Sequence, residues 1–258
     1  MTTTDSPTDP KRRVQAFWEA DPCGSEHASA PEGSPEFFAQ VERERYELEP
    51  YIADYADFAG TRGRSVLEIG VGLGTDFVQF ARSGAHVTGV DLTEHAVALV
   101  RGRLELEGLP GEVRVADAEQ LPFEDDSFDR VYSWGVLHHT PDTARSIKEA
   151  IRVLRPGGDL CVMLYGRHSW VAYGMWVRHG LLRGRPWRSL TDVIAHHMES
   201  YGTKAFTASE LRGLFTGLSD LRIDRISTTY DRAISRGLAR LTGDRLGWFL
   251  VVRGRRPS

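Results

Sequence analysis

The sequence predicts an α/β fold built on a doubly wound, mostly parallel sheet of seven strands. Between residues 64 and 165, short apolar segments of strand length alternate with amphipathic segments of helix length, as in successive βαβ units. A glycine-rich turn follows the first of these strands directly, before a helix. The length of 258 residues, of which 41% are hydrophobic, is enough for one elaborated domain with a substantial core.

The N-terminal part is expected to be helical and to precede the sheet. Residues 1–10 are rich in Thr, Ser, Asp and Pro, which is typical of a disordered tail. Residues 11–20 form a first helix, and a second begins where Ser34 caps the helix and Pro35 occupies its first turn. We therefore assign residues 11–60 to an N-terminal helical segment.

The sheet region is predicted element by element from its hydrophobic pattern. Strands are expected over 65–69, 87–90, 112–116, 127–133 and 159–165, and helices over 74–83, 93–108 and 140–154. A tight turn at residues 155–158, Arg-Pro-Gly-Gly, separates the last helix from the fifth strand.

The alternating pattern stops after the fifth strand. Residues 166–217 are predicted to be a helical insertion that packs over the sheet, and residues 61–165 and 218–258 to form the core, with strands over 220–228 and 246–252. The Trp and Met side chains of the insertion suggest an apolar or aromatic wall for a substrate. Its four arginines, Arg178, Arg183, Arg185 and Arg188, would either face an anionic group or solvate one face of a helix.

Composition argues against several classes of protein. The net charge is −4, so no global positive field favours nucleic acid, and no apolar run is long enough for a membrane span. The first residues lack the apolar stretch of a secretory signal, and two cysteines, Cys23 and Cys161, cannot form a disulfide framework. We expect a reduced, cytoplasmic protein without a metal site, because no carboxylate or thiolate joins the scattered histidines at ligand spacing. The oligomeric state stays open.

The glycine turn and an acidic residue beyond it predict a nucleotide-like ligand. Gly70, Gly72 and Gly74 follow the first strand, and Asp91 ends the second strand, where a carboxylate can accept both hydroxyls of a ribose. A dinucleotide fingerprint would require glycine at position 75, where this chain has Thr75. A nicotinamide-dependent oxidoreductase is therefore the less favoured interpretation, also because Glu68 would repel a pyrophosphate.

Four motifs in order resemble those of the class I S-adenosylmethionine-dependent methyltransferases, which have a Rossmann-like fold. The first is Glu68-x-Gly70-x-Gly72-x-Gly74, and the second is the loop over residues 115–123 after the third strand. The others are the fourth strand over 128–133 with the following Leu137-His138-His139, and the turn over residues 154–158. The resemblance covers about residues 60–165.

The resemblance implies that the cofactor is S-adenosyl-L-methionine and gives each matched residue a role. The glycines would let its methionine part pass over the backbone, with Glu68 near the ammonium group. Asp91 would hold the ribose, while Leu92, Asp117 and the Ala118 N–H would contact the adenine. Ser133 would lie near the sulfonium. Related enzymes also close an N-terminal lid over the cofactor, a role that would fall to Trp18 and Tyr46; covering the edge of the sheet is the alternative for these aromatics.

The histidine pair after the fourth strand is the candidate catalytic group. A neutral imidazole there can remove a proton from an acceptor, and we favour His138 over His139, which would instead help to start the next helix. Methyl transfer can also proceed by positioning alone. Trp134 would shape the acceptor site or only pack.

The expected function is methylation of a small-molecule acceptor with an apolar or aromatic body, with transfer to oxygen preferred. Transfer to nitrogen or carbon, and cofactor binding without methyl transfer, remain alternatives. A nucleic-acid substrate is not expected, since the chain is mildly acidic and lacks the Asn/Asp-Pro-Pro-aromatic motif of amino-methylating DNA enzymes.

Overall fold

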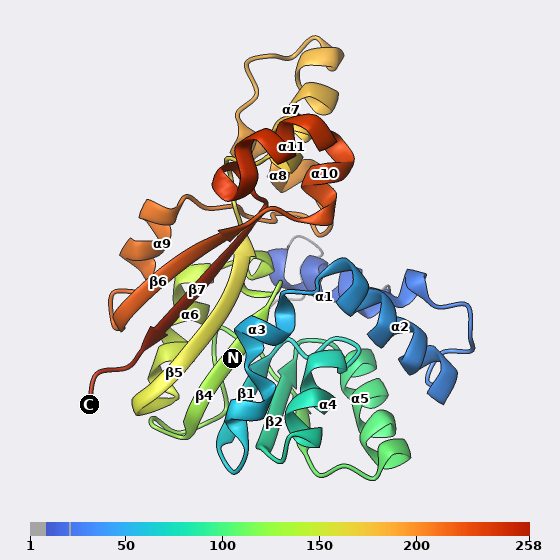
Figure 1. Cartoon of the computed structure of the whole chain (residues 1–258), viewed down its shortest axis with the longest axis vertical. Coiled ribbons are helices and arrows are strands. Elements are labelled where there is room, and N and C mark those ends of the chain that lie inside the picture. The colour runs from blue at the N-terminus through green and yellow to red at the C-terminus, as the bar shows by residue number, and fades with distance from the viewer. Residues whose placement is uncertain (1–8, 21) are drawn as a thin grey trace.

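The computed structural model describes residues 9–20 and 22–258, and its centre is a seven-stranded sheet in the order β3-β2-β1-β4-β5-β7-β6 (Figure 1). The strand β7 is antiparallel to β5 and β6, and the other neighbours are parallel, so the predicted mostly parallel sheet is confirmed. The strands are β1 (Ser65–Ile69), β2 (His86–Asp91), β3 (Glu112–Val115), β4 (Phe128–Trp134), β5 (Leu154–Tyr165), β6 (Ser219–Ile226) and β7 (Phe249–Arg255).

Helices cover both faces of the sheet, because successive strand residues point to opposite sides. On one face, α3 (Ile52–Ala56), α4 (Thr75–Arg82) and α5 (Glu94–Glu107) pack in a buried cluster that includes Val66 and Phe77. On the other face, α6 (Thr143–Arg152) and α9 (Ala208–Leu214) pack in a second cluster with Leu67. The alternation of Val66 and Leu67 shows how one strand supplies both cores.

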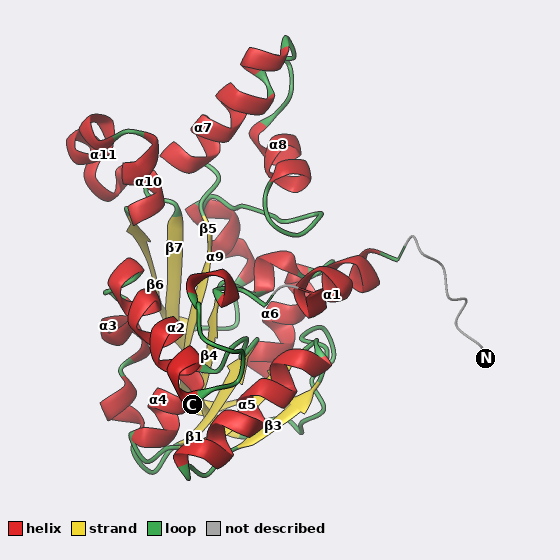
Figure 2. Cartoon of the chain, turned by 90° about the vertical axis from the view of Figure 1, so that its right-hand side faces the viewer, coloured by secondary structure: helices red, strands yellow, loops and turns green. Residues whose placement is uncertain are grey.

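The N-terminal helices are α1 (Pro10–Ala20) and α2 (Pro35–Leu48). The predicted cap is present, since Ser34 Oγ accepts a hydrogen bond from the Phe37 N–H at 3.1 Å. The α1 helix starts at Pro10, and residues 1–8 of the predicted tail lie outside the described part of the chain. Both helices contact α5, so they lie beside the ends of β1 and β2 (Figure 2).

Four helices gather beyond the end of the sheet at which β5 ends and β7 begins (Figure 1). We call them the cap: α7 (Trp170–His179), α8 (Leu190–His197), α10 (Thr229–Ile234) and α11 (Arg236–Thr242). The predicted insertion therefore does not pack over the sheet as a unit, because only its last helix, α9, lies on a face. The sequence pattern missed α10 and α11, which contain six and seven residues and show too few turns for a clear period.

Several predicted boundaries differ from the structure, and the last strand, expected over 246–252, is β7 over residues 249–255. The Arg-Pro-Gly-Gly turn lies within β5 as a bulge, since Leu154 pairs with Phe128 and Asp159 already with Arg130. The helix expected from residue 140 begins at Thr143, after a 3₁₀ turn. The described 3₁₀ turns are Ser25–His27, Phe58–Thr61, Leu137–His139, Leu181–Arg183 and Gly243–Leu246. Within the described ranges, no helix has the length and apolar character needed to cross a bilayer.

Candidate functional site

A cavity of about 540 Å³ lies at the carboxyl ends of β1, β2 and β4. Its walls come from the turn after β1, the N-terminal helices, the loops after β3 and β4, and the cap, which contributes Val171 and Tyr230. The carboxyl ends of parallel strands are where open α/β sheets bind ligands. The volume is in the range of sites for molecules of cofactor size.

The glycine turn opens one side of this cavity. Gly70, Gly72 and Gly74 all have positive φ, at 80°, 50° and 74°. A Cβ on Gly70 would come within 2.2 Å of Val136, and one on Gly74 within 2.8 Å of Val100, whereas one on Gly72 would meet no atom within 4 Å. Gly70 and Gly72 line the cavity, but Gly74 does not, so Gly74 serves the packing of the helix. Gly72 thus leaves a bare backbone surface at the ligand side.

Asp91 is fixed at the end of β2 by hydrogen bonds from two sides. Its Oδ2 accepts the Gly72 N–H at 3.0 Å, and its Oδ1 accepts the N–H and hydroxyl of Thr93 at 3.0 and 2.8 Å. Burial raises the pKa of this carboxyl, and the hydrogen bonds oppose that shift. Asp91 and the neighbouring Leu92 both line the cavity, as the sequence predicted for a ribose and an adenine contact.

Glu68 presents an unsatisfied carboxylate to the cavity. The side chain is 4% exposed, and its Oε2 is buried without a hydrogen-bond partner among the described residues. Burial, reinforced by the negative charge of Asp76, raises the pKa of Glu68 well above its usual value. A buried carboxylate in this state is stabilised by a cation, so the site fits the ammonium group of the expected cofactor.

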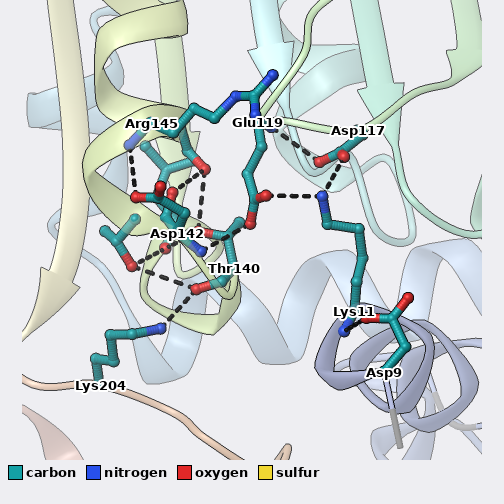
Figure 3. Close-up of polar contacts among 11 residues, drawn as sticks. Asp9, Lys11, Asp117, Glu119, Thr140, Asp142, Arg145 and Lys204 are labelled. Carbon is teal, nitrogen blue, oxygen red and sulfur yellow. Dashed lines mark hydrogen bonds and ion pairs between the residues drawn. The ribbon is translucent and has the colours of Figure 1, made fainter. Parts of the chain in front are cut away.

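An ion pair that the sequence did not predict closes the side of the cavity near β3. Lys11 of α1 donates to Asp117 at 2.5 Å and to Glu119 at 2.7 Å, and Glu119 also accepts the Asp142 N–H at 2.8 Å (Figure 3). Asp117 and Ala118, the two predicted adenine contacts, line the cavity beside Lys11. The α1 helix is therefore held over this end by charge. No local pattern could have revealed the pair, because 106 residues separate its members.

The predicted lid residues have different positions. Trp18 lines the cavity, with its ring edge-on to His139 at 5.1 Å. Tyr46 does not line the cavity, contrary to the expectation. Its hydroxyl donates to the buried carboxylate of Asp76 at 3.0 Å, which also binds Arg45 at 2.5 Å, and so it anchors α2 to α4. Arg45, next to Tyr46, is the residue of this pair that faces the cavity.

The histidine pair is divided by the fold, and the preference for His138 is wrong on geometry. His138 is fully buried, does not line the cavity, and stacks on the ring of Tyr165 at 3.8 Å. Burial, with the nearby charge of His139 and Lys204, lowers the pKa of His138 well below its usual value. His139 does line the cavity, although it is only 5% exposed.

His139 is held through one ring nitrogen, and its other nitrogen, Nε2, is buried and forms no hydrogen bond with a described residue. Its Nδ1 lies 2.8 Å from Ser200 Oγ and 3.0 Å from Thr203 Oγ1. Its Nε2 lies 3.3 Å from the Glu199 carboxylate. The segment after α8 thus orients the imidazole that the cavity exposes, and Nε2 is the nitrogen nearer a negative charge.

Two further predicted residues lie at the end of β4. Ser133 is fully buried, donates to the Ile69 carbonyl at 2.9 Å and does not itself line the cavity. Trp134 lines the cavity, and its Nε1 donates to Glu49 Oε2 at 2.7 Å. The following residues, Gly135 and Val136, complete the lining at this strand end.

Sequence reasoning missed the far end of the cavity, where carboxylates and aromatic rings meet. Glu49 comes from the end of α2, Glu199 from the segment after α8, Tyr165 from β5, and Tyr230 from α10. None of these segments contains a sequence motif, and their side chains meet only in the tertiary structure. Of the two alternatives for the arginines of the insertion, contact with an anionic group in the cavity is not supported, because none of the four lines it; they are Arg178, Arg183, Arg185 and Arg188.

Comparison with known proteins identifies the domain. Residues 67–162 match the family Methyltransf_11, described as a methyltransferase domain. Methyltransferase GfsG of Streptomyces halstedii is 40% identical over 103 residues, which are 39% of this chain and 37% of the relative. An uncharacterized protein of Mycobacterium tuberculosis is 33% identical over 66% of this chain and 59% of its own length. A putative methyltransferase of Haloferax volcanii, solved with its Trm112 activator, has the same fold, with a TM-score of 0.63 at 18% identity over 95% of this chain and 98% of that one.

Residues 67–162 therefore match a methyltransferase domain in sequence, and the chain shares its fold with a solved methyltransferase. The cofactor of the family is S-adenosylmethionine. The chain spans less than two thirds of the length of the curated relatives that it matches.

Proposed function

We propose that the protein is an S-adenosylmethionine-dependent methyltransferase that acts on a small molecule with an apolar or aromatic body. The observation that carries this proposal is one cavity that is lined by Glu68, Gly72 and Asp91 and also by a set of aromatic side chains. When bound, the cofactor supplies an electrophilic methyl group on a sulfonium and becomes S-adenosylhomocysteine.

The residues at the first end suit the parts of the cofactor. Asp91 would accept hydrogen bonds from the ribose hydroxyls, and Leu92 would pack against the adenine; both line the cavity. Asp117 accepts from the adenine amino group, sharing its carboxylate with Lys11. The open backbone at Gly72 accommodates the methionine part, and Glu68 pairs with its ammonium group, which relieves a buried and otherwise uncompensated carboxylate.

His139 is the residue that serves a hydroxyl acceptor. Its imidazole, which lines the cavity, would take up the proton that a hydroxyl acceptor loses on methylation. The neighbouring carboxylate of Glu199 stabilises the resulting imidazolium, and the hydroxyls of Ser200 and Thr203 fix the ring. Transfer to oxygen is therefore the reaction that this group of residues favours.

Release of S-adenosylhomocysteine, measured over a panel of phenols, alcohols and amines, tests the proposal. With an acceptor found in this way, we expect His139→Ala to lower kcat by about 10²–10⁴-fold while the affinity for S-adenosylhomocysteine stays unchanged. An unaltered kcat would remove His139 from the reaction. Cofactor binding without release on any acceptor would instead indicate a binding protein that does not transfer methyl groups.

A further inference from the structure

The acceptor end of the cavity has a wall of aromatic and sulfur-containing side chains. Tyr165 and Trp248 stack at 4.3 Å, and Phe249 packs edge-on to Trp134 at 6.3 Å. Met163, Met198 and Tyr230 extend the same wall. Aromatic faces attract a cation that is brought close to them.

The charges around the cavity are strongly unbalanced. Two cationic side chains of the described chain line it, Lys11 and Arg45, and both already form ion pairs with carboxylates. The acidic residues that line it are nine: Glu26, Glu44, Glu49, Glu68, Asp76, Asp91, Asp117, Glu119 and Glu199. The bound cofactor, with one net positive charge, does not balance this excess. Of the nine, Glu49 and Glu199 are the two that lie at the far end of the cavity, away from the predicted cofactor contacts.

Glu49 is the buried carboxylate at that end. It is 9% exposed, and its Oε2 accepts the Trp134 N–H at 2.7 Å, but it forms no ion pair with any described residue. Burial and the negative charge of Glu199 raise the pKa of Glu49, against the effect of Arg45. Glu199 itself accepts from the Tyr165 hydroxyl at 3.1 Å and approaches His139. The two carboxylates thus line the same cavity, near enough for each to affect the charge of the other.

We propose that the acceptor carries a protonated amine, which binds between Glu49 and Glu199 while the apolar body of the acceptor packs on the aromatic wall. This inference rests on the proposed function and adds the substrate class. An ammonium group there gains charge-assisted hydrogen bonds and contact with aromatic faces. A carboxylate or phosphate would meet like charge at this place. The amine is the anchor of the acceptor, whichever of its atoms receives the methyl group.

Three probes of one shape test the inference by binding rather than by turnover: benzylamine, benzyl alcohol and benzoate. Calorimetry would be performed on the protein loaded with S-adenosylhomocysteine. We expect benzylamine to bind at least about tenfold more tightly than benzyl alcohol, with benzoate the weakest. Equal or tighter binding of benzyl alcohol or benzoate, or no binding of benzylamine, would overturn the inference.

Substitutions locate the effect on the two carboxylates. Glu49→Gln keeps an oxygen for the Trp134 N–H, and we expect it to weaken benzylamine binding about tenfold without changing the binding of benzyl alcohol. Glu199→Gln should act in the same direction. Glu47→Gln is the matched control, since Glu47 is exposed on the same helix and does not line the cavity. Benzylamine binding that is unchanged in both Glu49→Gln and Glu199→Gln would refute the proposed site.

The affinity for S-adenosylhomocysteine, measured in each protein, separates this inference from the proposed function. Unchanged cofactor affinity and melting temperature in the variants show that they are folded and loaded. A wild-type protein that does not bind S-adenosylhomocysteine would contradict the proposed function, whereas a loaded protein without amine preference contradicts only the inference about the acceptor.

Discussion

Replacing Asp91 with Asn tests the assignment of the ribose site. The carboxylate of Asp91 accepts hydrogen bonds from Gly72 and Thr93 and retains further acceptor capacity toward the cavity. In Asp91→Asn, the amide oxygen can still accept from Thr93. The amide nitrogen, however, would face the Gly72 N–H, donor against donor, and the negative charge would be lost.

The size of the expected effect follows from the hydrogen bonds to the ribose. A hydrogen bond to a charged group contributes about 1.5–3 kcal/mol, so losing two of them costs about 3–6 kcal/mol. This corresponds to a rise of about 10²–10⁴-fold in the Kd for S-adenosylhomocysteine. The control Thr93→Val removes the hydroxyl that donates to the same carboxylate at 2.8 Å but keeps the charge of Asp91. This variant should lose only about 1 kcal/mol of binding free energy for S-adenosylhomocysteine.

Isothermal titration calorimetry with S-adenosylhomocysteine measures both variants against the wild type. Circular dichroism and the melting temperature establish that each variant is folded. If Asp91→Asn binds as tightly as the wild type, or no more weakly than Thr93→Val, the ribose does not bind at Asp91 and the orientation of the cofactor in the cavity is wrong.

Three further substitutions test other parts of the structure. Lys11→Ala should speed the dissociation of S-adenosylhomocysteine about fivefold in stopped-flow experiments, because a partly exposed ion pair is worth up to about 1 kcal/mol; an unchanged rate would show that α1 does not close the site. Folding raises the pKa of Glu68, so this residue contributes stability below its unfolded pKa and that contribution is lost as the pH rises. Glu68→Gln should therefore raise the melting temperature of the cofactor-free protein at neutral pH. The same variant should bind the cofactor more weakly. A lower melting temperature would contradict this. The pKa of His138 is lowered on folding, so the fold loses stability as the pH falls below about 6.5, the usual pKa of histidine. The melting temperature of His138→Phe should therefore depend less on pH between about 5 and 7, and this variant should keep its activity. A loss of kcat would make His138 a candidate base again.

The part of the site that the sequence predicted is the part built from consecutive residues. Gly70 and Gly72 follow β1 directly, and Asp91 ends β2, so parallel pairing of the two strands brings them together. The hydrophobic pattern fixes that pairing, and a fixed spacing along the chain then becomes a fixed geometry. Cofactor contacts in such a fold are readable because they depend on short segments at strand ends.

The remaining contacts join segments that are distant in the sequence. Glu49 meets Trp134 across 85 residues, and His139 meets Ser200 across 61. The hydrophobic periodicity of the sequence does not specify these contacts, since they depend on how the cap and the N-terminal helices pack. Of the adjacent residues His138 and His139 only His139 lines the cavity, and only the tertiary structure determines which of them does.

The central claim is that the cavity at the carboxyl ends of β1 and β2 binds S-adenosylmethionine. Calorimetric titration of the wild-type protein with S-adenosylmethionine, and separately with NAD⁺, tests it most directly. We expect one molecule of S-adenosylmethionine to bind per chain, and we expect no binding of NAD⁺ in its own titration. Tight binding of NAD⁺, or no binding of S-adenosylmethionine by the folded protein, would contradict the claim.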